Sequence, residues 1–206
     1  MTRCLGCRAN VTNLSLIPII DAHAAKHPVQ DVWEMSTYGA TLAFLRQRFS
    51  NVISSEFFPG IASGALVSGV LAQDVQRLSL ADESVDLITS NQVFEHVEDD
   101  SKGYAECYRV LRPGGALIFS VPLYDIPTTL QLARVEEGKL EHLETPEYHD
   151  SRLGGPGSAL CFWRHSFHDI SARVARLGFN TRLEEVRLPY SAATSTYVIY
   201  AEKPTK

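Results

Sequence analysis

The sequence predicts an α/β fold with a mostly parallel sheet that is covered by helices on both faces. Residues 85–121 contain an apolar run, a helical pattern and a second apolar run, and strands joined by a crossover helix lie parallel. Residues 183–188 and 196–201 are two more apolar runs, with too few residues between them for a crossover helix. They must therefore pair antiparallel. Together with the strands expected earlier in the chain, these runs predict a mostly parallel sheet with an antiparallel C-terminal strand.

The spacing of apolar residues in the first third of the chain predicts two helices and two strands. Residues 11–27 carry apolar side chains at helical spacing, interrupted by Pro18, which predicts a kinked helix. Residues 30–35 predict a short first strand. The helix after it has an apolar face formed by Leu42, Leu45 and Phe49. Residues 51–55 predict the second strand, and the glycine-rich segment 57–70 predicts a loop or one short helical turn.

The helix within residues 85–121 has clear signals at both ends. Its apolar face follows the i, i+3, i+4, i+7 spacing and consists of Tyr104, Cys107, Tyr108 and Leu111. Asp99, Asp100 and Ser101 are candidates for its N-cap, and a Pro-Gly-Gly sequence at 113–115 ends it. Residues 116–121 are then the next buried strand.

The long segment 122–164 predicts an insertion. Its charges and apolar spacing predict a short helix within 130–143, and a turn-rich stretch follows at 154–157. A connection of this length in a compact domain commonly forms a lid or a binding element. After it, Ser166 is a cap candidate for a last helix, whose buried face is formed by Ile170, Val174 and Leu177.

Size and charge indicate one domain and disfavour some partners. The 206 residues suffice for a single three-layer domain, 1–206, with an N-terminal helical segment at 1–29 and a lid or substrate insertion at about 122–164. A net charge of −5 gives no electrostatic reason to expect a nucleic acid. No apolar run approaches the roughly 18 residues of a membrane span. The first 24 residues imitate a secretory leader, but Pro18 and several polar residues interrupt it, so we expect a cytoplasmic protein.

Two cysteines and two histidines near the N-terminus formally fit a zinc-ligand spacing: Cys4, Cys7, His23 and His27. Such a set also arises by chance, in which case both histidines would lie on an exposed helix face. The two interpretations stay open, and we assign no metal to the predicted active site.

Residues 74–121 resemble the class I S-adenosylmethionine-dependent methyltransferases, in particular the small single-domain proteins of methyltransferase type 11. The resemblance is carried by the Asp-Glu-Ser-Val-Asp-Leu sequence at 82–87, by Glu95-His96-Val97 and by Arg-Val-Leu-Arg-Pro-Gly-Gly at 109–115. It implies a Rossmann-like fold with a seven-stranded, mostly parallel sheet, S-adenosylmethionine as cofactor, and methyl transfer to an oxygen or nitrogen atom. The substrate is set elsewhere in the chain, and we expect a small or medium polar molecule or a glycan.

The loop after the first strand departs from the family pattern. The family has an acidic residue followed by Gly-x-Gly-x-Gly, whereas this chain has Glu-Met-Ser-Thr-Tyr-Gly-Ala at 34–40. A pyrophosphate needs close approach of glycine backbone, but S-adenosylmethionine has no phosphate and needs only a tight turn. Ser36 and Gly39 could provide that turn. The loop therefore argues against a nicotinamide dinucleotide more than against S-adenosylmethionine.

The resemblance also implies which residues hold the cofactor. Glu56 stands at the end of the second strand, where an acidic residue accepts hydrogen bonds from both ribose hydroxyls. Asp74 would accept the adenine amino group while the amide of Val75 meets a ring nitrogen. The carboxyl end of the fourth strand would face the methionine part. The expected cofactor-binding residues are Glu34, Ser36, Gly39, Glu56, Phe57, Asp74, Val75, Asn91 and Gln92.

His149 and His96 are the candidate catalytic residues, since a histidine can act as general base. His149 lies between Tyr148 and Asp150 in the insertion, but it could equally be a surface histidine. His96 could reach the reactive methyl group or only bond the backbone at the helix start. A base is needed only if the acceptor is a hydroxyl or a protonated amine.

Two other classes of function stay open. The glycine-poor loop would also suit a methyltransferase-like protein that binds a ligand or partner without catalysis. The shared strand–helix–strand architecture would also suit a nicotinamide-dependent oxidoreductase. Retention of NADH but not of S-adenosylhomocysteine would favour the latter.

Overall fold

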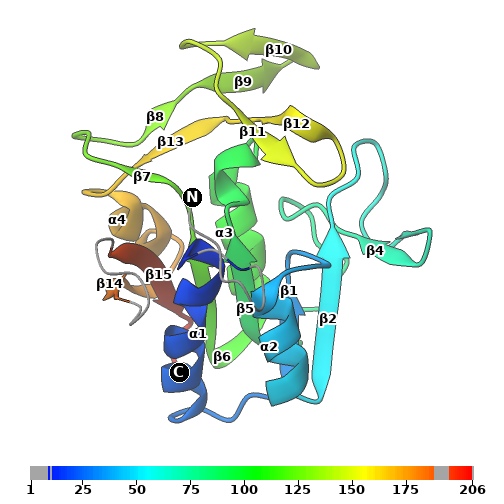
Figure 1. Ribbon diagram of the computed structural model, residues 1–206, viewed down its shortest axis with the longest axis vertical. Helices are drawn as coiled ribbons and strands as arrows, with labels where there is room; N and C mark the ends of the chain where they lie inside the picture. The colour runs from blue at the N-terminus through cyan, green and yellow to red at the C-terminus, as the bar shows by residue number, and fades with distance from the viewer. Residues whose placement is uncertain (1–8, 10, 188–194, 206) are drawn as a thin grey trace.

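The computed structural model describes residue 9, residues 11–187 and residues 195–205. Its main sheet has the strand order β14-β15-β6-β5-β1-β2-β4-β3 (Figure 1). The strands are β1 (Asp31–Glu34), β2 (Asn51–Glu56), β3 (Leu66–Val67), β4 (Val70–Ala72), β5 (Val85–Asn91), β6 (Leu111–Ser120), β14 (Asn180–Val186) and β15 (Thr196–Glu202).

The pairing of these strands confirms the predicted sheet. Strands β4, β2, β1, β5 and β6 run parallel, whereas β15 pairs antiparallel with both β6 and β14. The two-residue β3 adds an eighth strand at the edge. Strand β1 lies in the middle of the sheet. The chain first adds β2 and β4 on one side of β1 and then crosses to the other side, where it adds β5 and β6.

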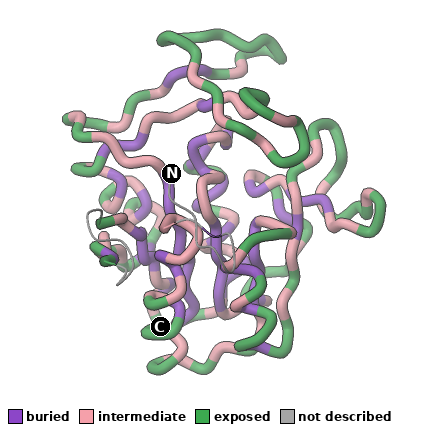
Figure 2. The backbone as a smooth tube through the Cα atoms, viewed as in Figure 1, coloured by how far each residue is buried: buried purple, intermediate pink, exposed green. Residues whose placement is uncertain are grey.

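Helices cover both faces of the sheet. One face packs on α1 (Val11–Ala24) and α2 (Ala40–Arg48), and the other on α3 (Asp100–Val110) and α4 (Ile170–Ala175). Along β6, Leu117 and Phe119 belong to the α3–α4 core, while Ala116 and Ile118 belong to the α1–α2 core. Successive side chains of a strand point to opposite faces, so one strand supplies both cores. Figure 2 shows this buried interior between exposed loops.

The segment after β6 forms three small sheets that lie over the carboxyl ends of the parallel strands (Figure 1). Strand β13 pairs with β7 and β8, β9 pairs with β10, and β11 pairs with β12. The strands are β7 (Leu123–Tyr124), β8 (Leu130–Gln131), β9 (Ala133–Glu136), β10 (Lys139–His142), β11 (Tyr148–Ser151), β12 (Gly155–Leu160) and β13 (Trp163–Ser166).

The short helix predicted within 130–143 is wrong, because β9 and β10 form a hairpin there. Glu136 pairs with Lys139 across a two-residue turn, in which Glu137 has φ 51° and Gly138 has φ 75°. A tight hairpin turn needs a positive φ at both central residues, and glycine adopts it without strain. The turn signal, not the spacing of charges, decides the structure.

The segment 57–70 contains a second hairpin of the same kind where a loop or helical turn was predicted. Val67 of β3 pairs with Val70 of β4, and the turn residues Ser68 and Gly69 have φ 51° and 81°. The prediction therefore missed a strand pair that extends the sheet beyond β2.

The ends of the last two helices differ in how well they were predicted. Asp99 caps α3 as expected, since its side chain accepts a hydrogen bond from the Lys102 amide at 3.2 Å. Ser166 is not the cap of α4: it ends β13, and its hydroxyl donates to the Ile126 carbonyl. Helix α4 starts at Ile170, and Ile170 and Val174 are buried as predicted.

The proposed exposed histidine face near the N-terminus is wrong for His23. This residue is buried, with Nδ1 2.9 Å from the Tyr200 hydroxyl and its ring stacked on His27. Cys4 and Cys7, the leader-like residues 1–8 and Leu188 lie outside the described residues, so the zinc prediction is not tested. Within the described part of the chain, no helix combines the length and the apolar character needed to cross a membrane.

Candidate functional site

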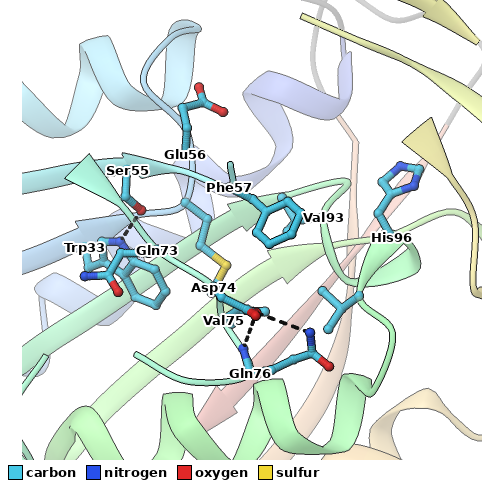
Figure 3. A pocket seen from close by; sticks show the side chains of 12 residues that line it. Trp33, Ser55, Glu56, Phe57, Gln73, Asp74, Val75, Gln76, Val93 and His96 are labelled. Carbon is cyan, nitrogen blue, oxygen red and sulfur yellow. Dashed lines mark hydrogen bonds between the residues drawn. The ribbon is translucent and has the colours of Figure 1, made fainter. Parts of the chain in front are cut away.

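A cavity opens where β1, β2 and β4 end (Figure 3). Its volume is about 500 Å³ including the part that is open to solvent. Strand-reversal points at the carboxyl ends of parallel strands are where α/β sheets bind ligands. The residues that line the cavity are Trp33, Met35, Ser55, Glu56, Phe57, Gln73, Asp74, Val75, Gln76, Val93, His96 and Val97.

The floor of the cavity is rigid and largely apolar. Trp33 is 1% exposed and its indole Nε1 donates to the Ser55 hydroxyl at 2.9 Å, which ties β1 to β2. Met35 and Val75 are buried in the same core as Trp33. A flat ring that enters this cavity therefore meets a preformed apolar surface with few polar groups around it, as is usual for small-molecule sites.

Glu56 ends β2 at the rim of the cavity. Its Oε1 accepts hydrogen bonds from the amide and hydroxyl of Thr37, at 3.1 and 2.6 Å. Arg152, at the tip of the β11–β12 hairpin, approaches the same oxygen with Nη2 at 3.3 Å. The loop after β1 and the insertion therefore both meet at this carboxylate.

Asp74 lies in the turn after β4, on the same cavity. Its Oδ1 accepts from the backbone amide of Gln76 at 2.9 Å and from the Gln76 side chain at 3.2 Å (Figure 3). Its own amide donates to the Ser63 hydroxyl at 2.8 Å. These three bonds fix the turn, so the orientation of the carboxylate is set before any ligand binds.

The structure brings together four of the nine predicted cofactor residues on this cavity: Glu56, Phe57, Asp74 and Val75. The other five do not line it: Glu34, Ser36, Gly39, Asn91 and Gln92. Glu34 is buried and accepts a hydrogen bond from Thr89 of β5. Burial raises the pKa of Glu34 to about 8, against the Thr89 hydrogen bond and with a smaller contribution from Glu56.

The remaining predicted residues surround the adjoining loop. Gly39 precedes α2 with φ 101°, a conformation that L side chains rarely adopt, and the Ser36 hydroxyl donates to the Tyr38 carbonyl at 3.2 Å. The Asn91 side chain donates to Thr41 at 2.9 Å and accepts from Ser120 at 3.0 Å. These contacts connect the ends of β5 and β6 to the start of α2, beside the cavity wall.

The two candidate catalytic histidines lie together, although 53 residues separate them in the chain. His96 ends the 3-10 helix η1 (Phe94–His96), and its Nε2 is 3.2 Å from Nδ1 of His149 on β11. His149 does not pair with its neighbour Asp150, whose carboxylate accepts from the Gly157 amide instead. The nearest carboxylates are Glu147, 3.5 Å from His149 Nε2, and Glu95.

The environment of His96 favours its neutral form. Burial lowers its pKa, the Leu160 carbonyl opposes this through a 2.8 Å hydrogen bond to Nδ1, and His149 lowers it further. His96 also lines the cavity, at the end opposite Trp33 (Figure 3). The predicted contact of His96 with the backbone is thus made, but to β12 of the insertion and not to the helix start.

Sequence reasoning missed four residues of this region: Thr37, Glu95, Arg152 and Cys161. Arg152 reaches Glu56 from 96 positions further along the chain, a contact that no local pattern encodes. Glu95 precedes His96 in the Glu-His-Val sequence at 95–97, but nothing in the sequence indicates that the Glu95 carboxylate is buried. Thr37 had a weak signal, because it lies in the loop that replaces the glycine-rich turn.

Comparisons with known proteins agree with this geometry. The sequence profile of a methyltransferase domain matches residues 34–119. The chain is 45% identical over 138 residues to a Mycolicibacterium smegmatis protein named "Probable S-adenosylmethionine-dependent methyltransferase", covering 60% of this chain and 53% of that protein. It is 53% identical over 57 residues to a malonyl-[acyl-carrier protein] O-methyltransferase of Methylococcus capsulatus, covering 28% of this chain and 21% of the relative.

A solved structure extends the likeness of the fold over nearly the whole chain. It is the Burkholderia thailandensis 1,6-didemethyltoxoflavin N1-methyltransferase with its acceptor and S-adenosylhomocysteine bound. The TM-score is 0.62 at 15% identity, and the match covers 94% of this chain and 79% of the other. In its strand order and over residues 34–119, the chain is therefore similar to the class I S-adenosylmethionine-dependent methyltransferases. It spans about a fifth to a half of the length of the first curated relatives that it matches.

Proposed function

We propose that this protein is an S-adenosylmethionine-dependent methyltransferase that acts on an oxygen or nitrogen atom of a small or medium polar acceptor. One observation carries the proposal: Glu56 and Asp74, at the ends of neighbouring strands, line a single cavity with an apolar floor. That combination suits an adenosine, whose ribose hydroxyls need an acceptor at one end and whose adenine needs an acceptor and a flat apolar slot at the other.

The residues present fit the cofactor. Glu56 would accept the ribose hydroxyls, Asp74 would accept the adenine amino group, and Trp33 and Met35 would support the ring from below. The methionine part would then extend over the loop that contains Ser36 and Gly39, toward Asn91. In this proposal the five predicted residues that do not line the cavity would lie around the methionine half of the cofactor: Glu34, Ser36, Gly39, Asn91 and Gln92.

The bound sulfonium would supply an electrophilic methyl group, and the chain would orient the acceptor and exclude water. Orienting two reactants in this way can recover about 7–11 kcal/mol of an activation barrier. The insertion after β6 covers the carboxyl ends of the strands and is therefore the segment that would close over the acceptor (Figure 1). A neutral His96 at the end of the cavity could accept a proton at Nε2 if the acceptor is a hydroxyl.

The relatives support both acceptor atoms. One of them is named for methylation of an oxygen of malonyl-acyl carrier protein, and the solved structure is named for methylation of a ring nitrogen. The tyrosines and histidines of the insertion suit a polar acceptor of either kind, so the proposal includes both oxygen and nitrogen as the atom that receives the methyl group.

The test combines binding with turnover. Calorimetric titration should show one S-adenosylhomocysteine bound per chain and no comparable binding of NADH. Methyl transfer from labelled S-adenosylmethionine is then measured over a panel of polar hydroxyl, carboxyl and amine compounds. Asp74→Ala should weaken cofactor binding, whereas Asp125→Ala, at an exposed aspartate of the insertion, should not.

Each outcome points to one class of protein. Binding with transfer to at least one acceptor supports the enzyme. Cofactor binding without transfer to any compound would support the non-catalytic ligand-binding alternative. Binding of NADH in place of S-adenosylhomocysteine would overturn the proposal.

A further inference from the structure

Three side chains next to the cavity direct ligand atoms toward one point. Nε2 of His96 and Nδ1 of His149 are 3.2 Å apart. Oε1 of Glu95 is 3.8 Å from each of these two nitrogens. The three atoms therefore form a small triangle, in which every edge joins two groups that can donate a lone pair. Cys161 adds a sulfur to the cluster, and the histidine and cysteine ligand atoms all lie within 4.8 Å of one another.

The outer nitrogens of both histidines face acceptors. Nδ1 of His96 is 2.8 Å from the Leu160 carbonyl oxygen, which can only accept, so this nitrogen carries the proton and Nε2 carries the lone pair. Nε2 of His149 faces Oε1 of Glu147 at 3.5 Å, on the side away from His96. Glu147 is itself held by Tyr124 and Arg164, both at 2.8 Å.

Neither neutral tautomer of His149 satisfies both of its nitrogens. If His149 is protonated at Nε2, toward Glu147, two lone pairs oppose each other across 3.2 Å. If it is protonated at Nδ1 instead, its other lone pair faces a carboxylate. Histidines that bind a metal commonly direct the outer nitrogen at a carbonyl or a carboxylate, and both histidines here do so.

Glu95 supplies the independent observation. Its side chain is almost completely buried, and among the described residues neither carboxylate oxygen has a hydrogen-bond partner. A buried carboxylate without donors is strongly disfavoured as an anion, so it either takes up a proton or has a positive charge beside it. The two inner histidine nitrogens, each 3.8 Å from Oε1, could bind a cation together with this carboxylate.

We propose that Glu95, His96 and His149 bind a divalent transition-metal ion of the Zn²⁺ type as three ligands that leave a fourth position open. Zn–N and Zn–O bonds of about 2.0–2.2 Å imply edges of about 3.3–3.6 Å in a tetrahedral site. The observed edges of 3.2 and 3.8 Å are within a few tenths of an ångström of that range. Sγ of Cys161 lies beside the site, 3.8 Å from Nδ1, the outer nitrogen of His96. Imidazole ligands favour zinc over Mg²⁺ and Ca²⁺, which prefer oxygen.

The site lies at the end of the cavity, because His96 lines it. An ion there would occupy Nε2 of His96, so that nitrogen can act as a base only in the metal-free protein. The ion would be positioned to hold a polar group of a molecule that occupies the cavity. The binding of the ion itself requires neither S-adenosylmethionine nor an acceptor, so it is tested on the protein alone and independently of the proposed methyl transfer.

The experiment is a titration of the full chain with Zn²⁺, and with Mg²⁺ for comparison, by calorimetry and by thermal shift. Cys4→Ser and Cys7→Ser are introduced first, which removes the cysteines of the other zinc candidate. One Zn²⁺ should bind per chain and raise the melting temperature, as a ligand of the folded state does. His149→Ala and the isosteric Glu95→Gln should each weaken binding at least tenfold to a hundredfold. His142→Ala, at an exposed histidine of β10, should leave it unchanged.

Circular dichroism of each metal-free variant verifies that it is folded, and Glu95→Gln keeps the shape of the side chain if His149→Ala does not fold. Co²⁺ in place of Zn²⁺ gives a visible spectrum in which a sulfur ligand would be recognised. None is expected, because Sγ of Cys161 lies on the outer side of His96, so Cys161→Ser should leave the spectrum and the binding unchanged. The absence of binding, as expected if the two histidines share only a proton, would overturn the proposal. So would Zn²⁺ binding that both His149→Ala and Glu95→Gln leave intact, or selectivity for Mg²⁺.

Discussion

Three parts of the chain meet at the carboxylate of Glu56. It ends β2, it accepts from Thr37 in the loop after β1, and it contacts Arg152 in the insertion. Its side chain is only 14% exposed, so water competes weakly for it. In the proposed function the same carboxylate binds the ribose hydroxyls, so its removal should lower the affinity for the cofactor.

Glu56→Ala should weaken the binding of S-adenosylhomocysteine about tenfold to several hundredfold. Two hydrogen bonds to a charged acceptor are worth roughly 1.5–3 kcal/mol each, part of which water recovers. Calorimetric titration measures the change, and Glu144→Ala, at an exposed glutamate, is the matched control. Equal affinity for the Glu56→Ala variant and the unaltered protein would remove this residue from the site.

Arg152→Ala should have the opposite effect, tightening S-adenosylhomocysteine binding by about two- to fivefold. Arg152 is 44% exposed, and an ion pair of that kind contributes about 0.2–1 kcal/mol. In the absence of ligand the arginine occupies the oxygen that the ribose would use, so its removal lowers the cost of binding. Arg134→Ala, in the β9–β10 hairpin, serves as the control. Weaker binding by the Arg152→Ala variant would mean that this arginine contacts the ligand.

Among the elements, α3 and α4 are joined by one buried ion pair. Arg173 of α4 donates from Nη2 to both carboxylate oxygens of Asp100 at 2.7 Å, and its guanidinium also covers the Trp163 ring. Asp100 is 0% exposed. The pair therefore links the start of α3, which lies next to η1, to the helix that follows the insertion.

Arg173→Ala should lower the free energy of unfolding by about 3 kcal/mol, because it leaves the Asp100 charge buried without its partner. Urea denaturation followed by circular dichroism measures this value. The matched control is Arg176→Ala, an exposed arginine just after α4, which should change it by less than about 0.5 kcal/mol. If both substitutions had the same small effect, the pair would not stabilise the helix contact.

At the scale of the whole molecule, Glu34 makes stability depend on pH. Its folded pKa of about 8 lies above the ordinary value of 4.5, because the carboxyl is buried between β1 and β5. The contribution is fully present below pH 4.5, where both states are protonated. It is lost as pH rises toward 8, since the unfolded chain releases a proton that the folded chain retains.

The free energy of unfolding of the unaltered protein should therefore fall relative to Glu34→Gln between about pH 5 and 8. The limiting slope is about 1.4 kcal/mol per pH unit. Urea denaturation at several pH values gives both curves, and their difference isolates Glu34 from other titrating groups. Parallel curves over this range would contradict a raised pKa.

Much of the molecule followed from local patterns. The spacing of Tyr104 and Cys107, the cap at Asp99 and the closely spaced C-terminal strands predicted α3 and the mixed sheet correctly, since helix and strand periodicity are properties of a few neighbouring residues. Leu111, predicted on the same helix face, instead begins β6, which runs through the Pro-Gly-Gly sequence at 113–115. The insertion was predicted less well. The β9–β10 hairpin depends on two backbone conformations at 137–138, which the charge pattern around them obscured.

The sequence by itself determined most elements of the main sheet and its helices, the family resemblance and the strand end at which Glu56 stands, because each of these depends on neighbours along the chain. Only the tertiary structure decided which side chains share a space. It placed Arg152 on Glu56, and it brought His149 to His96 and a buried Glu95 across 53 positions. Such contacts depend on how the insertion folds back over the sheet, and burial, which sets their electrostatics, is a property of the packed molecule.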